Sequence, residues 1–407
     1  MKEVFICMNR SREETNKANL NNYPVVLLHG MFGFGQQQVT NKVLPYFGLW
    51  NTDIRKMFND MGIPCVAPSM GPFTSAWNRA CEIYAQLFGG TVDYGKAHAE
   101  KYGMKRYGKT YEALLPQWGT LDENGELIKI NIIGHSFGGV SGRMLAELMA
   151  NGSKEEQEAT DPDDLSELFK GGHKGWVHSI TTLASPHNGM TSVEGRVGTA
   201  MKHICRGICD VMNILDITPL HSIYDLSLEM YGQAPYMHFA DIGRDELYKS
   251  YMFDNKDTIV YDLTIQGAHK ANDKLPTQDD IYYFSHRGCR TKTVAGFEVP
   301  KLKAFPILNV LGFFMGIQGG SVTPTKEWRK NDMVINTVSA ECPDGAPRRD
   351  VPFGFDLSTA KPGVWHVYPC EEKDHMSYCG WMENHKKYAG FFQDLYNTAS
   401  SVPTVNK

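Results

Sequence analysis

The stretch that most constrains this chain runs from residue 130 to residue 139 and reads INIIGHSFGG. Its first four positions are mostly β-branched, which favours a buried strand. From Val140 to Ala150 apolar side chains recur at roughly helical spacing. A tight turn joins the two, and a side chain at Gly134 or Gly138 would collide there with the neighbouring strand or helix. The sequence therefore predicts a strand, a strained turn and a helix, with the hydroxyl of Ser136 raised above the carboxyl edge of a sheet.

Gly-x-Ser-x-Gly between a strand and a helix is the nucleophile elbow of α/β-hydrolases. The pentapeptide alone can be coincidence, but here both flanks have the required pattern. We therefore predict an α/β-hydrolase fold, in which a mostly parallel central sheet carries helices on both faces.

A second strand, Val25–Leu28, runs into His29-Gly30 and a glycine-rich loop. In this fold that loop builds half of the oxyanion hole, so the backbone N–H groups of Met31 and Phe137 are the candidate donors. A phosphate-binding loop is the alternative, but no Gly-Lys-Ser/Thr follows.

Composition and periodicity predict the remaining elements more coarsely. Strands are expected at 63–67, 177–184, 280–285 and 364–368, and a helix at 77–87. Residues 73–111 have no clean period and are predicted to form an ordered excursion off the sheet. Residues 299–317 are apolar and punctuated by glycine, which indicates loop and wall rather than a single helix. The expected organisation is a polar segment, 1–22, followed by one α/β domain, 23–400.

The overall composition excludes several functional classes. The net charge is -5 and Lys/Arg-rich runs are absent, so no nucleic-acid partner is expected. No apolar run is long enough for a transmembrane segment, and no signal peptide is recognisable. We expect a cytoplasmic protein, or a secreted one if a leader has been removed. The nine cysteines lack a C-x-x-C motif and are read as mostly free thiols. Cys205 and Cys209, four apart, are either packed thiols or metal ligands on one helix face.

A serine nucleophile needs a base and an orienting carboxylate, which follow it in the order Ser, Asp/Glu, His in this fold. Three late histidines are candidates for the base. His366 alternates within a predicted strand and His385 lies in a predicted terminal helix, whereas His375 lies on a polar loop. This placement favours His375.

Asp332 stands on a loop before an apolar run and is the candidate acid. Asp350, Asp356 and Asp374 remain alternatives. Asp374 is adjacent to His375 and would face the wrong way to orient it.

Several segments together resemble the bacterial lipases of the thermoalkaliphilic bacilli and the staphylococci. They read LLHG, SAWNRACEIYAQLFGGTVDYGKAHA, GHSFGG, ASPHNG and NDMVINTVS. The similarity runs from about Pro24 to about Tyr388. It implies a triad of Ser136, Asp332 and His375, because the catalytic acid and histidine of the family fall at those positions.

The resemblance also implies a helical lid at residues 190–232. Apolar side chains recur there at spacings of three and four, and such a stripe is more often core. They are Met201, Ile204, Cys205, Ile208, Val211, Met212 and Leu215. In the family this segment covers the active site, where its apolar face meets lipid or the acyl pocket.

The family binds zinc and calcium, but this chain departs from both ligand sets. The zinc positions fall at Asn78, His98, Met104 and Asp262, and only His98 and Asp262 keep a ligand type. Those two are expected to pair directly or through water, unless nearby His or Cys side chains substitute. The calcium carboxylates are replaced by Ser377 and Met382, although Glu383 lies one place further. We expect no cofactor.

The expected function is hydrolysis of carboxylic esters, most of all acyl glycerols, through an acyl-enzyme on Ser136. The partner is an ester or lipid substrate, with transient contact at a lipid interface. The alternatives are a short-chain carboxylesterase or polyester hydrolase and, in another class, a catalytically silent binding protein on the same fold.

Overall fold

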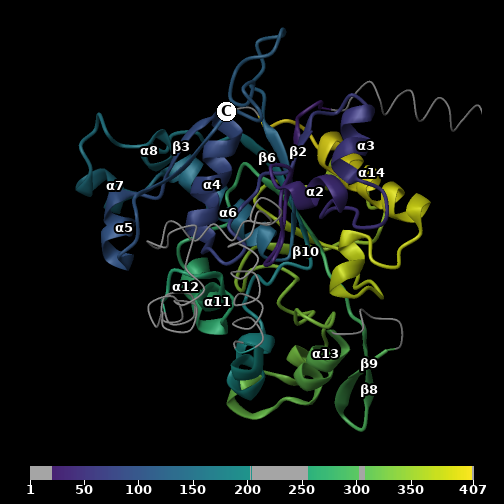
Figure 1. The fold of residues 1–407 in the computed structure, drawn as a ribbon. Coiled ribbons are helices and arrows are strands. Elements are labelled where there is room, and N and C mark those ends of the chain that lie inside the picture. Colours follow the sequence, from purple (N-terminus) through teal and green to yellow (C-terminus); the bar gives the residue numbers. More distant parts are fainter. Residues whose placement is uncertain (1–20, 202, 204–254, 302–307, 406–407) are drawn as a thin grey trace, which may run out of the picture.

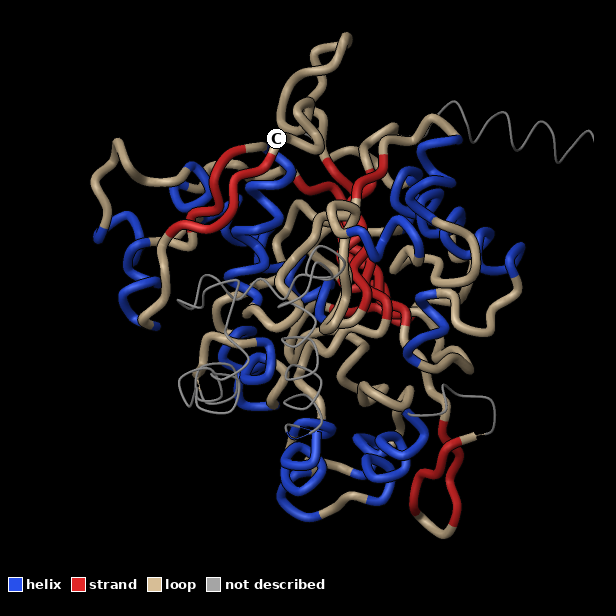
Figure 2. Tube along the Cα trace, viewed as in Figure 1, coloured by secondary structure: helices blue, strands red, loops and turns tan. Residues whose placement is uncertain are grey.

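The computed structural model describes residues 21–201, 203, 255–301 and 308–405 (Figures 1 and 2). At its centre lies a seven-stranded sheet with all strands parallel, in the order β10-β11-β7-β6-β5-β1-β2. The strands are β1 Val25–Leu28, β2 Cys65–Val66, β5 Ile130–His135, β6 Val177–Leu183, β7 Tyr282–His286, β10 Arg348–Asp350 and β11 Trp365–Val367. The five predicted strands besides the one before Ser136 are thus confirmed to within two residues at each end, and β5 extends to His135.

Helices cover both faces of this sheet, because parallel strands need long crossover connections. The helices are α2 Val39–Val43, α3 Ile54–Asp60, α4 Ala76–Phe88, α5 Lys96–Tyr102, α6 Phe137–Asn151, α7 Lys154–Ala159, α8 Glu167–Lys170, α11 Ile259–Asp262, α12 Ile265–Asn272, α13 Leu308–Ile317 and α14 His385–Ser401. In Figure 1 α4, α5, α7 and α8 lie on one side of the sheet and α3 and α14 on the other.

Successive side chains of each strand point to opposite faces and so enter two different cores. Val26, Leu28 and Ile132 pack in the cluster that includes α4 and α6. Val25 and Leu27 pack in the cluster that includes α3 and α14. Every residue of β5 is buried, as expected for a strand with neighbours on both edges and layers on both faces.

Between β2 and β5 the chain leaves the sheet. α4 is followed by α5 and by an antiparallel pair, β3 Gly90–Asp93 and β4 Tyr107–Tyr111. The indole of Trp77 stacks on His98, with ring centroids 4.9 Å apart, and donates a hydrogen bond of 2.8 Å to the Tyr94 carbonyl. The Glu156 carboxylate accepts the N–H groups of Ala97 and His98 at the start of α5. Ring stacking and this cap hold the excursion against the main domain.

The expectation of loop and wall rather than a single helix at 299–317 is corrected in part, because α13 forms a regular helix from Leu308 to Ile317. β8 Thr291–Val294 and β9 Phe297–Pro300 form a hairpin before it. α13 is apolar almost all round, so its sequence has no helical period that could be recognised. A Cβ at Gly316 would lie 1.9 Å from the Glu298 carbonyl, so glycine permits the close approach of helix and hairpin.

Two expectations fall largely beyond the described ranges. Nearly all of the N-terminal segment 1–22 and most of the lid 190–232, including Cys205 and Cys209, lie outside them. Among the described residues, no helix has both the length and the apolar character needed to cross a membrane.

Candidate active site

The turn after β5 has the strained geometry that its sequence predicts. Ser136 has φ 56° and ψ -130°, in the left-handed region that L-residues rarely adopt, and α6 begins at the next residue. A Cβ at Gly138 would lie 2.1 Å from the Leu28 carbonyl oxygen of β1. A Cβ at Gly134 would lie 2.5 Å from the Gly139 nitrogen. Both glycines are therefore required for the elbow to close.

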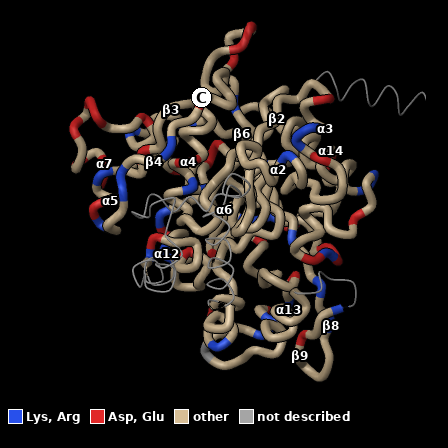
Figure 3. Tube along the Cα trace, in the orientation of Figure 1, with Lys and Arg blue, Asp and Glu red and all other residues tan. Residues whose placement is uncertain are grey.

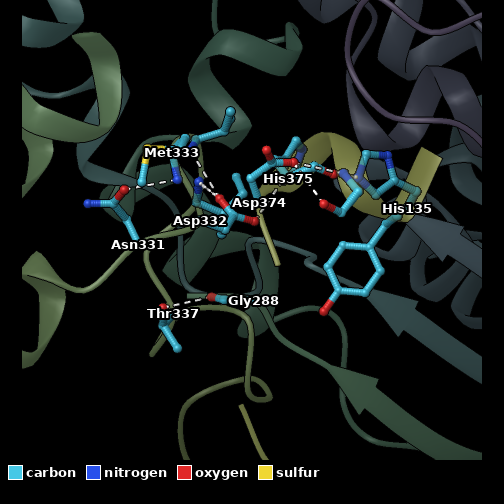
Figure 4. A network of polar contacts seen from close by, with 12 residues as sticks. His135, Gly288, Asn331, Asp332, Met333, Thr337, Asp374 and His375 are labelled. Atoms are coloured by element: carbon cyan, nitrogen blue, oxygen red, sulfur yellow. Dashed lines mark hydrogen bonds and ion pairs between the residues drawn. The ribbon is translucent and has the colours of Figure 1, made fainter. Parts of the chain in front are cut away.

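Asp332 and His375 lie together beside this elbow (Figure 4). The Nδ1 atom of His375 is 2.9 Å from Oδ2 of Asp332, and the His375 N–H donates to the Asp332 carbonyl at 2.9 Å. The imidazole of His135, the residue before Ser136, packs on the His375 ring with centroids 4.5 Å apart. Nδ1 is thus engaged by the acid, which leaves Nε2 as the nitrogen that can serve a serine hydroxyl.

The carboxylate of Asp332 is oriented by its own turn. Its second oxygen, Oδ1, accepts the N–H groups of Val334 and Ile335 at 3.0 and 2.6 Å. The neighbouring Asn331 side chain accepts the N–H of Met333 at 2.9 Å. These bonds fix one oxygen to the backbone and point the other at His375.

The rejected candidates for the acid have other structural partners. Asp374 caps the short 3₁₀ helix His375–Cys379, where its carboxylate accepts the N–H of Ser377, and so turns away from the imidazole. Asp350 pairs with Arg348 at 2.6 Å on an exposed edge. Asp356 accepts the N–H of Ser358 at the start of another 3₁₀ turn.

The two rejected histidines are also placed elsewhere. His366 lies in β11 and is held by the Tyr283 carbonyl at 3.0 Å, and burial lowers its pKa. His385 is the first residue of α14 and is exposed.

A buried hydrogen-bonded chain that the sequence did not predict joins the loops on either side of Ser136. The Gly30 N–H donates to the Tyr46 hydroxyl at 3.0 Å, and that hydroxyl lies 2.7 Å from Nδ1 of His135. Nε2 of His135 lies 3.1 Å from the His375 carbonyl oxygen. Since a carbonyl can only accept, Nε2 carries the proton and Nδ1 accepts from Tyr46. Burial, reinforced by His375, lowers the pKa of His135 and keeps this ring neutral.

The peptide between Gly30 and Met31 is oriented by a buried guanidinium. Nη2 of Arg79 donates to the carbonyls of His29 and Gly30, at 2.6 and 3.2 Å. Because C=O and N–H point in opposite directions across a trans peptide, this contact turns the Met31 N–H away from Arg79. The Phe137 N–H is the first of α6 and has no partner within its helix. These two N–H groups stay the predicted oxyanion donors.

The residues at the zinc positions do not form a zinc-binding set. His98 pairs with Asp257, at 3.1 Å between Nε2 and Oδ1, and not with Asp262 as expected. Nδ2 of Asn78 donates to the other oxygen of Asp257 at 2.8 Å and lies 3.9 Å from the thioether of Met104. Asp262 instead accepts the Ala76 N–H, and burial raises its pKa to about 7.

The calcium positions are equally altered. Ser377 donates its N–H to Asp374, and Met382 is exposed. The Asn51 amide donates to the carbonyls of Gly380 and Glu383 in the same loop. Throughout the described residues, no three His, Cys, Asp or Glu side chains converge on a point where a metal could bind.

Comparison with known proteins supports the resemblance seen in the sequence. A family model described as "Lipase-like, C-terminal domain" matches residues 21–401. Lipase 2 of Staphylococcus aureus (strain MSSA476) is 33% identical over 368 residues, 89% of this chain and 51% of that protein. A lipase of Staphylococcus epidermidis is 32% identical over 384 residues, 91% of this chain and 52% of that protein. The chain thus spans about half the length of these curated relatives.

Solved structures match over most of both chains. Staphylococcus hyicus lipase superposes with a TM-score of 0.78 at 29% identity, covering 92% of this chain and 94% of that one. Lipase 1 from Pelosinus fermentans superposes with a TM-score of 0.79 at 33% sequence identity, covering 94% of this chain and 100% of that one. EstA from Clostridium botulinum superposes with a TM-score of 0.79 at 31% sequence identity, covering 95% of this chain and 89% of that one. Together with the parallel sheet, these matches confirm the predicted α/β-hydrolase fold.

Proposed function

The chain belongs to the family described as "Lipase-like, C-terminal domain", and from that premise we propose that it is a serine hydrolase of carboxylic esters. Its substrates are acyl glycerols or other esters with apolar acyl chains, taken up in transient contact with a lipid interface. The observation that carries the proposal is the buried Asp332–His375 hydrogen bond of 2.9 Å beside the strained turn of Ser136.

In the proposed reaction the Ser136 hydroxyl attacks the ester carbonyl while Nε2 of His375 takes its proton. Asp332 stabilises the imidazolium that forms. The N–H groups of Met31 and Phe137 hold the oxyanion of the tetrahedral intermediate. His375 then protonates the leaving alcohol, and a water activated by the same imidazole hydrolyses the acyl-enzyme.

A covalent label tests the nucleophile. A fluorophosphonate should modify the protein once, at Ser136, and the Ser136→Ala variant should not react. Ser358→Ala removes an exposed serine from a 3₁₀ turn and should be labelled like wild type. Labelling of the Ser136→Ala variant would show that another residue is the nucleophile, and no labelling at all would favour a binding protein.

Kinetics test the reaction itself. Ser136→Ala, His375→Ala and Asp332→Asn should each lower kcat by about 10⁴-fold or more, with little further loss on combination, because the three residues act as a unit. A series of p-nitrophenyl esters, run beside emulsified triglyceride, measures the preferred acyl length. More than a tenth of wild-type activity in Ser136→Ala would refute the assignment.

A further inference from the structure

Two cysteines lie together where β7 and β11 end, next to the segments that carry the acid and the histidine. The pairing of the strands continues beyond them as a parallel bridge between Gly288 and Glu371. The Cys289 N–H donates to the Glu371 carbonyl at 2.9 Å, and the Glu371 N–H donates to Arg287 at 2.9 Å. Cys289 and Cys370 are each one position from the bridged pair, so both side chains point to the other face of the extended chains. There the two thiols are neighbours, and the Cys370 thiol also donates to the Glu371 carbonyl oxygen 3.8 Å away.

The surroundings of the two sulfurs differ. The neighbouring Cys370 thiol, aided by the Thr291 hydroxyl 3.4 Å away, lowers the pKa of Cys289 to about 5. The Cys289 sulfur, together with partial burial, raises the pKa of Cys370, which is exposed and keeps its proton. A thiolate beside an accessible protonated thiol is the arrangement of an attacking and a resolving cysteine.

The other described cysteines lack this arrangement. They are buried, and burial raises the pKa of each: Cys65, Cys81, Cys342 and Cys379.

We propose that Cys289 and Cys370 form a reversible dithiol–disulfide site that small disulfides such as oxidised glutathione oxidise. The Cys289 thiolate attacks one sulfur of the small disulfide and displaces its other half as a thiolate. Cys370 then loses its proton and attacks the Cys289 sulfur, which releases the second half. The displaced thiolates take up protons. Two electrons pass from the protein thiols to the small disulfide, and two small thiols are formed.

The location gives this bond a structural consequence. The Gly288 carbonyl accepts the Thr337 hydroxyl at 2.9 Å, and the Arg290 N–H donates to the Asn331 carbonyl at 2.9 Å, so the segment around Cys289 supports the acid turn (Figure 4). Cys370 opens the segment that leads to His375. The disulfide therefore links the two segments covalently. It closes a loop of about 80 residues, which restricts the conformations of the unfolded chain. The Asp332–His375 pair is already formed in the dithiol state, so oxidation raises stability and leaves the pair in place.

Oxidation of the full chain with oxidised glutathione tests the site. After alkylation and digestion, mass spectrometry should find one peptide pair linked through Cys289 and Cys370. The melting temperature should rise by about 3 to 8 °C over the dithiothreitol-treated protein. Cys370→Ser should abolish both changes, and Cys342→Ser, which removes a buried thiol elsewhere, should keep them. A different cross-link, a mixed disulfide that never resolves, or equal melting of both forms would overturn the proposal.

A second pair of variants tests the contact between the thiols. Cys370→Ser keeps a hydroxyl donor beside Cys289, whereas Cys370→Ala removes it. Iodoacetamide at pH 6.5 should therefore alkylate Cys289 several-fold faster in the serine variant than in the alanine variant. Equal rates would show that Cys370 does not activate Cys289. Repeating these measurements with Ser136→Ala separates them from the ester hydrolysis proposed above.

Discussion

Tyr46 contributes one hydroxyl, and that hydroxyl joins the loop of the oxyanion donors to the residue before the nucleophile. In Tyr46→Phe the buried Gly30 N–H loses the Tyr46 hydroxyl, at a cost of about 1–3 kcal/mol. Nδ1 of His135 keeps only the weaker Cys379 thiol, 3.4 Å away. We expect kcat to fall about 10- to 100-fold with a small change in KM, because the lost bonds position backbone groups and do not touch substrate. The kinetics of p-nitrophenyl ester hydrolysis measure this split. Tyr23→Phe removes a hydroxyl bonded to Thr404 and should leave kcat unchanged; an equal loss in both variants would contradict the role of Tyr46.

Glu82 is a buried acid whose ionisation should make stability depend on pH. Burial raises its pKa to about 7, although it accepts the Gly71 N–H and the Tyr94 hydroxyl. Because the pKa of Glu82 is higher in the folded state than in the unfolded state, folding favours the protonated carboxyl. Its contribution to the free energy of unfolding is therefore present at pH 4 and is lost as pH rises to about 7. Glu82→Gln should therefore melt like wild type at pH 5. At pH 8 its free energy of unfolding should exceed that of wild type by up to about 2–3 kcal/mol. A gain that is equal at both pH values would contradict the shift.

Single residues also show what a sequence can predict about a site. Ser136 was predictable because its strained turn is encoded by its immediate neighbours. Tyr46 and His135 are 89 positions apart, and nothing in either local pattern reveals their hydrogen bond. Asp257 and Asp262 lie in one stretch and are both buried or half-buried acids. Only the packing of the segment before α11 against α5 shows that Asp257 faces His98.

At the scale of elements, two helical glycines have opposite roles. A Cβ at Gly138, in the first turn of α6, meets the Leu28 carbonyl, whereas a Cβ at Gly390, on the exposed side of α14, meets nothing within 4 Å. Gly138→Ala should lower the free energy of unfolding by at least about 2 kcal/mol, because the added methyl group pushes β1 away from the elbow. It should also remove most of the activity. Gly390→Ala should raise the free energy of unfolding by about 0.5–1 kcal/mol, because alanine has the higher helix propensity. Thermal melting compares the two, and a stable, active Gly138→Ala would show that the elbow tolerates a wider turn.

The elements themselves were predictable where burial imposes a pattern. The strands of the sheet read as short apolar runs because both of their faces are covered. α13 gave no such signal, because a helix that is apolar almost all round resembles a loop or a wall in sequence.

In the whole molecule, the parallel sheet brings segments that are distant in sequence to one edge. β5, β6, β7 and β11 are neighbours, so the turns beyond their carboxyl ends meet although they are up to 240 positions apart. The chain order of the triad candidates was predictable from this rule, but their separations were not. Lys and Arg positions are interspersed with Asp and Glu positions along the described backbone trace (Figure 3), in line with the nearly balanced 41 Lys and Arg and 46 Asp and Glu of the sequence.

Finally, we expect the whole protein to fold and stay folded without zinc or calcium, unlike the family it resembles. The Asn78 amide donates a hydrogen bond to one oxygen of Asp257, and the His98 ring makes an ion-pair contact with the other. The Asn51 amide donates to carbonyls of the loop after His375. Metal analysis of protein purified without added ions should find no stoichiometric metal, and EDTA should not lower the melting temperature.

A double variant is the matched control for this prediction. Asn78→Asp together with Met104→His restores two carboxylates and two imidazoles around the position now spanned by the Asp257–His98 pair, a ligand set that zinc prefers. We expect this variant to take up one zinc and to lose several degrees of melting temperature on adding EDTA, because bound metal stabilises the folded state alone. Stoichiometric zinc in the wild-type protein would show that other side chains complete a zinc site. The contacts of Asn78 and His98 with Asp257 would then not take the place of the metal.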